Sequence, residues 1–136
     1  MKNKPRVLRI GIASKDEMRA RTLAIARGAL KPRPDDPKVW FTSVESLAQV
    51  LSSRNKLLLE LIRKARPESI RELAEISGRH EGNLSRTLRT MARYGLVRLS
   101  KAEGRRLVPE VPYDEVRLNL PLADRETGSR GRPAPV

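Results

Sequence analysis

The chain has 136 residues, enough for one domain with a tail, and aromatic side chains make up only 3% of it. Its 29 Lys and Arg against 16 Asp and Glu give a net charge of +13, which indicates a polyanionic partner. The absence of cysteine excludes disulfides and thiolate metal sites, and no apolar run is long enough to span a bilayer.

The chain begins with a predicted strand, helix and second strand. Apolar residues alternate with others over residues 8–12, which is the period of a half-buried strand. Ser14 and Glu17 have the spacing of a capping box, which predicts a helix over about residues 15–30. The proline-broken connection KPRPDDP follows, and residues 39–41 form a short apolar run that is predicted to be a strand.

This N-terminal extension has two possible roles. About 40 residues cannot easily bury a core of their own. In the first interpretation, the extension packs against one side of the domain that follows. In the second, it makes a subunit interface with Trp40 and Phe41 as anchors. The sequence favours neither.

Two further helices are predicted before the middle of the chain. Thr42 and Glu45 have capping-box spacing, and an apolar face follows through Leu51. A second helix is predicted to begin at Ser52 or Ser53. Its apolar stripe is expected to be core and consists of Leu57, Leu58, Leu61, Ile62 and Ala65.

A helix, a tight turn and a longer helix are predicted next. Ser69 and Glu72 form a capping box for the first helix, and Gly78 ends it in the left-handed conformation. The second helix is expected over residues 81–94, because Gly95 stops it.

The second of these helices has an apolar side and a basic side. Leu84, Leu88 and Met91 share one side, at helical spacing. The other side carries Arg, Asn and Thr, and no carboxylate follows Glu81 in the helix. Arg can fork onto guanine and Asn onto adenine. The alternative is that this side is simply exposed to solvent. The absence of acidic counter-charges favours DNA binding instead.

Residues 97–108 are predicted to form a two-stranded hairpin, with Leu96 at the start of its first strand and SKAEG as its turn. Three basic residues at the tip could reach the minor groove or the flanking DNA backbone: Lys101, Arg105 and Arg106. Residues 115–120 alternate again, and we expect this strand to pair either with the N-terminal strand or with an edge of another subunit.

The segment NLSRTLRTMARYGLVRLS resembles the recognition helix and first wing strand of MarR-type and related winged-helix transcriptional regulators. The resemblance covers roughly residues 53–112 and implies a winged helix-turn-helix. It also implies major-groove or phosphate contacts by the helix and DNA contacts by the wing, through Asn83, Ser85, Arg86, Arg105 and Arg106. Gly82 departs from the family pattern, and no long dimerisation helices flank the module.

The extension and the layout from ESLAQVLSS to NLSRTL resemble a family of small DNA-binding proteins that often act as antitoxin-like partners of a neighbouring toxin. This second resemblance implies that one half of the protein represses its operon while another surface binds the toxin.

We expect an α+β fold, a winged helix-turn-helix with an N-terminal strand-helix-strand extension. The expected parts are the extension (1–42), the DNA-binding domain (43–122) and a disordered tail rich in Arg, Gly and Pro (123–136).

The expected function is sequence-specific binding of double-stranded DNA by a cytoplasmic transcriptional repressor that acts as a homodimer. Residues 81–94 would enter the major groove, and residues 97–108 would contact flanking DNA. The predicted DNA contacts are Ser69, Arg79, His80, Asn83, Ser85, Arg86, Arg89, Thr90, Arg93, Lys101, Arg105 and Arg106.

The sequence also allows a comparison with three other functional classes. The first alternative is an antitoxin that binds a toxin partner. The second is a protein or RNA interaction module, which is disfavoured because an RNA reader should expose aromatic side chains. The third is an enzyme, which we do not expect because the sequence offers one histidine, no cysteine and no Gly-rich phosphate loop. We likewise expect no cofactor, no metal and no membrane partner, and the start MKNKPRVLRI lacks the features of a signal peptide.

Overall fold

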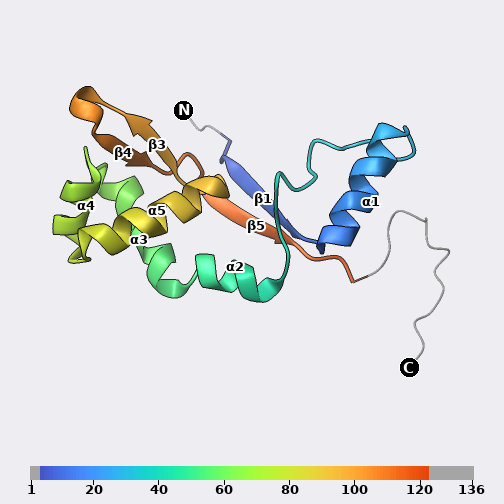
Figure 1. Ribbon diagram of the computed structural model, residues 1–136, viewed down its shortest axis with the longest axis horizontal. Helices are drawn as coiled ribbons and strands as arrows, with labels where there is room; N and C mark the ends of the chain where they lie inside the picture. The colour runs from blue at the N-terminus through green and yellow to red at the C-terminus, as the bar shows by residue number, and fades with distance from the viewer. Residues whose placement is uncertain (1–3, 123–136) are drawn as a thin grey trace.

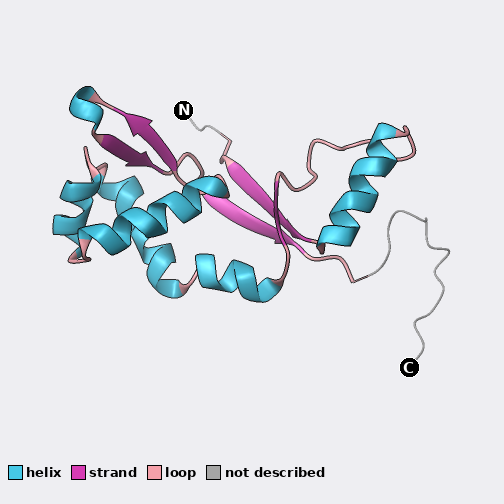
Figure 2. Ribbon diagram, in the orientation of Figure 1, coloured by secondary structure: helices cyan, strands magenta, loops and turns pink. Residues whose placement is uncertain are grey.

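The computed structural model describes residues 4–122, which form an α+β fold of five α-helices and five strands (Figures 1 and 2). In chain order these are β1 (Val7–Ile12), α1 (Lys15–Ala26), β2 (Val39–Phe41), α2 (Val44–Val50), α3 (Ser53–Ala65), α4 (Ile70–Ser77), α5 (Glu81–Arg93), β3 (Arg98–Lys101), β4 (Leu107–Glu110) and β5 (Glu115–Asn119). Helices α3, α4 and α5 and the hairpin β3–β4 lie at one end of an elongated molecule, and α1 lies at the other (Figure 1). The predicted tail, residues 123–136, lies outside the described residues.

β1 is the central strand of a parallel sheet of order β2-β1-β5. The first and last strands of the described chain, β1 and β5, are therefore hydrogen-bonded neighbours. Leu8 lies opposite Val116, and Ile10 lies opposite Leu118. Two partners were possible for β5, and in the structure it pairs with the N-terminal strand β1. Because paired residues of parallel strands point to the same face, Val116 and Leu118 share the face of the buried Leu8 and Ile10.

One hydrophobic cluster joins the helices to the sheet. Leu84, Leu88 and Met91 are each 0% exposed, as the apolar side of α5 predicts. The sheet adds three buried side chains to the same cluster: Leu8, Ile10 and Phe41. Residues on both sides of the predicted boundary at 42/43 therefore contribute to one core.

Helix α1 begins as predicted but is shorter and is not packed on the core. The Ser14 hydroxyl accepts from the Glu17 amide while the Glu17 carboxylate accepts from the Ser14 amide, which is a complete capping box. The helix ends at Ala26, earlier than predicted, and the left-handed Gly28 at φ 78° follows. No residue of α1 is buried, and Leu23 is 46% exposed, so its apolar residues do not form a core stripe.

The cap predicted for α2 is wrong by one residue. Ser43 and Ser46 form the reciprocal capping box, in place of Thr42 and Glu45. A serine hydroxyl can both accept from and donate to the backbone, so the box does not require a glutamate at its third position.

Helix α3 begins after Ser52, whose hydroxyl accepts from the Asn55 amide. The predicted apolar stripe is partly wrong, because Leu57 is 63% exposed and Ala65 is also exposed. Three residues of the helix are buried: Leu58, Leu59 and Ile62. In a run of three leucines, periodicity alone does not determine which two face the core.

Phe41 belongs to the core of its own chain, being 1% exposed, so its predicted role as an interface anchor is wrong. Trp40 is half-buried against the same chain, where it covers Gly11. A Cβ at Gly11 would lie only 2.5 Å from the Trp40 ring, so this approach requires glycine. The Arg21 guanidinium lies 5.3 Å from the Trp40 ring centroid. The extension therefore packs on the domain that follows it, which is the first of the two interpretations.

Candidate nucleic-acid interface

The start of α4 uses both predicted capping residues, but not as a reciprocal pair. The Ser69 hydroxyl accepts from the Glu72 amide at 2.9 Å. The Glu72 carboxylate accepts from the Glu68 amide at 2.8 Å, one residue before the predicted donor. Ser69 is half-buried, and its hydroxyl already has a hydrogen-bond partner within α4. Gly78, at φ 73°, ends α4 as predicted.

Helix α5 presents a polar surface opposite its buried side. Its cap is His80, and the helix stops before the left-handed Gly95, close to the predicted bounds. Four predicted contact residues are exposed on this helix: Asn83, Arg86, Arg89 and Arg93. Two more are partly exposed: Ser85 and Thr90.

Each arginine of α5 donates to a neutral oxygen three or four residues earlier on the helix. The three bonds are Arg86 Nη2 to Asn83 Oδ1 at 2.8 Å, Arg89 Nε to Ser85 Oγ at 3.4 Å and Arg93 Nη2 to Thr90 Oγ1 at 3.4 Å. Within residues 4–122, none of these arginines forms an ion pair. No carboxylate of the described residues therefore neutralises their positive charges.

Arg79 and His80, in the turn before α5, are engaged with the protein. Arg79 Nη1 donates to Asn55 Oδ1 of α3 at 3.3 Å, and the side chain is partly buried. Burial lowers the pKa of Arg79, and the charge of Arg54 lowers it further. His80 Nδ1 accepts from the Gly82 amide at 3.2 Å, so this exposed imidazole caps α5.

The hairpin begins two residues later than predicted, at Arg98 in place of Leu96. Leu96 and Val97 are buried in the hydrophobic cluster, where they tie the hairpin to the core. β3 and β4 are antiparallel, with Lys101 opposite Leu107.

The hairpin tip is a tight turn with exposed cations. Gly104 and Arg105 both have left-handed φ angles, 72° and 62°. Lys101, Arg105 and Arg106 are all exposed, and Glu103 is the carboxylate among them. The tip lies at the same end of the molecule as α4 and the start of α5 (Figure 1). The structure thus brings the predicted hairpin and helix contacts to one end of the protein.

Comparison with known families identifies this same region of the chain. The profile of the HVO_A0114 family matches residues 50–118, just over half of the sequence. The chain belongs to the HVO_A0114 family. The match runs from the end of α2 into β5 and contains the whole candidate interface. No curated protein and no solved structure gives a significant match.

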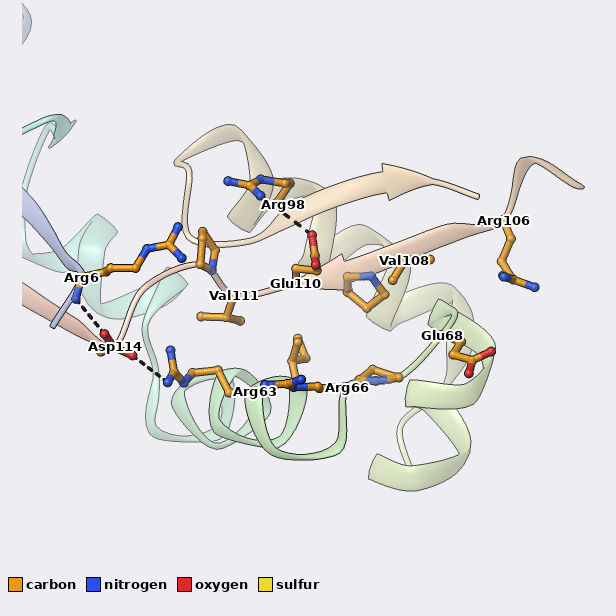
Figure 3. A pocket seen from close by; sticks show the side chains of 14 residues that line it. Arg6, Arg63, Arg66, Glu68, Arg98, Arg106, Val108, Glu110, Val111 and Asp114 are labelled. Atoms are coloured by element: carbon orange, nitrogen blue, oxygen red, sulfur yellow. Dashed lines mark hydrogen bonds and ion pairs between the residues drawn. The ribbon is translucent and has the colours of Figure 1, made fainter. Parts of the chain in front are cut away.

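This HVO_A0114 protein also has a basic surface that the sequence analysis missed. A groove of about 610 Å³ is bounded by α3, β4, the segment after β4 and the residue before β1 (Figure 3). Five arginines line it: Arg6, Arg63, Arg66, Arg98 and Arg106. Only Arg106 was predicted as a contact, because the others come from separate segments and no local pattern connects them.

Neither a metal cluster nor a membrane span is found in the part of this HVO_A0114 protein that the structure describes. Residues 4–122 contain no group of three or more His, Cys, Asp or Glu that could hold a metal ion. None of their helices is both long enough and apolar enough to cross a membrane.

Proposed function

We propose that this HVO_A0114 protein is a sequence-specific regulator that binds double-stranded DNA. In this proposal α3, α4, α5 and the hairpin β3–β4 act as a winged helix-turn-helix. Helix α5 enters the major groove, and the hairpin contacts the flanking DNA as a wing. The observation that carries the proposal is the row of exposed arginines on α5, which form no ion pair within residues 4–122, on a helix whose other side is buried.

The geometry of α5 suits base recognition. Leu84, Leu88 and Met91 fix the helix through its buried side, so the outer side chains project from a rigid support. Arg86 is held by Asn83, which presents a planar guanidinium of the kind that forks onto guanine. The net charge of +13 provides attraction to phosphate that is independent of sequence.

The aromatic residues favour duplex DNA over unpaired RNA. Proteins that read unpaired bases usually stack them on exposed aromatic rings. The chain has four aromatic residues, all within the described region, and none is exposed: Trp40, Phe41, Tyr94 and Tyr113. The toxin partner that the resemblance implies stays a prediction.

Selection from a random duplex library by the purified protein tests the proposal. We expect enrichment of a sequence motif, and binding of the enriched duplex at least tenfold tighter than a scrambled one. The double variant Arg86→Ala with Arg89→Ala should abolish this preference. Arg19→Ala with Arg27→Ala removes an exposed arginine of α1 and the exposed arginine that caps its end, and should leave the preference intact. If no motif is enriched, or if single-stranded RNA binds more tightly, the proposal is wrong.

We propose further that two copies of the chain associate through β5. Within residues 4–122, β5 is an edge strand with β1 as its partner, and its apolar residues Val116 and Leu118 are 37% and 42% exposed. A two-fold-related antiparallel pairing centred on Val116 would set Glu115 opposite Arg117 of the second copy. Such a dimer would suit a palindromic DNA site.

Light scattering after gel filtration tests this dimer. We expect twice the monomer mass for the wild type and the monomer mass for Leu118→Glu. Leu57→Glu places the same charge on an exposed leucine of α3 and should remain dimeric. A monomeric wild type at micromolar concentration would exclude the dimer.

A further inference from the structure

We propose that the arginine-lined groove between α3 and β4 is a binding site for a small organic anion. The ligand class is a doubly charged phosphate monoester, or a similar dianion, attached to an apolar body. The proposal concerns a different surface from the outer face of α5 and does not depend on DNA binding.

The size of the groove suits a small molecule. Its volume of about 610 Å³ lies within the range of about 300–1,000 Å³ that is common for small-molecule sites. The wall is in part apolar: Ile62, Pro67 and Pro109 are buried, and Val108 and Val111 are half-buried. An apolar body could pack on Val108 and Val111, which keep exposed surface, while its charged group meets the arginines.

The charges of the groove are unbalanced. Five arginines face three carboxylates, Glu68, Glu110 and Asp114. Two arginines have ion-pair partners in the groove, Arg63 with Asp114 at 2.7 Å and Arg98 with Glu110 at 3.9 Å. The other three form no ion pair within residues 4–122: Arg6, Arg66 and Arg106. Figure 3 shows these cations along the groove, with Arg6 and Arg106 at opposite ends. A dianion would supply the missing negative charge.

One end of the groove is held rigidly. Arg63 donates to the Tyr113 carbonyl and to the Asp114 carboxylate. Asp114 in turn accepts from the Arg6 amide at 2.7 Å. These bonds join α3, the two residues before β5 and the residue before β1, while the Arg6 guanidinium forms no ion pair with any other residue of the described range. A preformed rim of this kind reduces the ordering cost of binding.

Arg66 is in an unusual backbone conformation for an arginine. It caps α3 in the left-handed region, with φ 49° and ψ 60°, where glycine is the usual residue. Pro67 follows directly and is buried. Non-glycine residues held in the left-handed region cluster at active sites, ligand clamps and switch regions. In this case the side chain is one of the three groove cations that form no ion pair in the described part of the chain.

Binding to the groove would also affect the hairpin. Arg106 lines the groove and belongs to the hairpin tip, so an anion bound at that end of the groove would compete with DNA for its guanidinium. This regulatory consequence rests on the proposed function, whereas the binding itself does not.

Protein-detected NMR titration with phenyl phosphate tests the site, with inorganic phosphate and phenol as reference probes. We expect saturable shifts of the methyl groups of Ile62, Val108 and Val111, and affinity for phenyl phosphate at least tenfold higher than for either reference. Arg66→Gly should weaken binding at least tenfold. This variant should fold, because glycine readily adopts the left-handed conformation. Arg19→Ala is the matched control, because it removes one positive charge from the distant α1. This variant should bind phenyl phosphate normally.

Three outcomes would overturn the proposal. They are absence of saturable shifts, equal affinity for phenyl phosphate and inorganic phosphate, and unchanged binding by Arg66→Gly. Because none of these measurements uses DNA, failure of the groove proposal and failure of the DNA proposal can be told apart.

Discussion

The ring of Phe41 stacks on the ring of Tyr94, with centroids 4.1 Å apart and planes inclined by 13°. Phe41 is the last residue of β2, and Tyr94 caps the end of α5. The contact therefore connects the N-terminal sheet to the helix that we propose reads DNA. Since β2 pairs with β1, and β1 pairs with β5, the whole sheet is linked to that helix end.

Loss of this stacked pair should destabilise the fold. We expect Phe41→Ala to lower the free energy of unfolding by about 3–5 kcal/mol, since it leaves a cavity in the core. Phe41→Leu keeps most of the volume and should cost less. Urea denaturation followed by far-UV circular dichroism measures both. Equal stability of the wild type and Phe41→Ala would mean that β2 is not part of the cooperative core.

Much of the local structure of this chain can be predicted from its sequence. The apolar side of α5 follows the helical period, and the structure buries all three of its predicted residues. The ends set by Gly78 and Gly95 were also predicted, because left-handed glycines are strong local signals. The predicted cap at Thr42 failed because neighbouring Ser43 offers an equally good hydroxyl one residue later.

Contacts between segments far apart in the sequence are harder to predict. Pairing of β1 with β5 joins segments about 108 residues apart, and alternation identifies a strand without naming its partner. The basic groove collects Arg6, Arg66 and Arg106 from three separate segments, so it is visible only after folding. Helix α1 differs, because its apolar residues form only a thin stripe in the sequence, and no residue of the helix is buried.

A pair of leucine variants tests the corrected face of α3. Leu58→Ala should lower the free energy of unfolding by about 2–5 kcal/mol, because Leu58 is buried. Leu57→Ala should change it by less than about 0.5 kcal/mol, because Leu57 is largely exposed. Urea denaturation of the two variants compares adjacent residues with the same chemistry. The reverse order of effects would show that α3 is rotated relative to the structure described.

Asp114 should make stability depend on acid pH. The Arg6 amide, and after it the Arg63 guanidinium, lowers the pKa of the Asp114 carboxyl. Its folded pKa therefore lies below the unfolded value of about 3.9. The ionised carboxylate stabilises the fold above that value, and this contribution is lost as the pH falls through the folded pKa.

Urea denaturation at pH 7 and pH 3 measures this effect. We expect Asp114→Asn to be less stable than the wild type at pH 7, and the difference to shrink at pH 3. Asp35→Asn removes an exposed carboxylate that makes no hydrogen bond in the described structure and is the matched control. A constant difference between Asp114→Asn and the wild type at both pH values would contradict the assignment.

The hairpin tip should contribute affinity without sequence preference. Phosphate contacts act on every sequence alike. We expect Arg105→Ala with Arg106→Ala to weaken binding to the selected duplex and to random duplex by similar factors. The log–log slope of affinity against salt should flatten by about one unit for each lost phosphate contact. Fluorescence anisotropy across a salt series measures both quantities. Loss of binding to the selected duplex alone would instead make the wing a reader of bases.

Arg86 should contribute sequence preference. Its position two residues beyond the buried Leu84 directs it away from the core, and the Asn83 side chain holds its guanidinium at 2.8 Å. Two parallel hydrogen bonds to guanine provide about 1–3 kcal/mol of discrimination, so Arg86→Ala should cost about 10- to 100-fold on the selected duplex and much less on random duplex. Arg86→Lys should restore charge but little preference, because an ammonium group lacks the planar fork. Anisotropy titrations of both duplexes at one salt concentration provide the comparison. Equal losses on the two duplexes would show that Arg86 contacts phosphate. Unchanged binding to both would show that α5 does not enter the major groove of DNA.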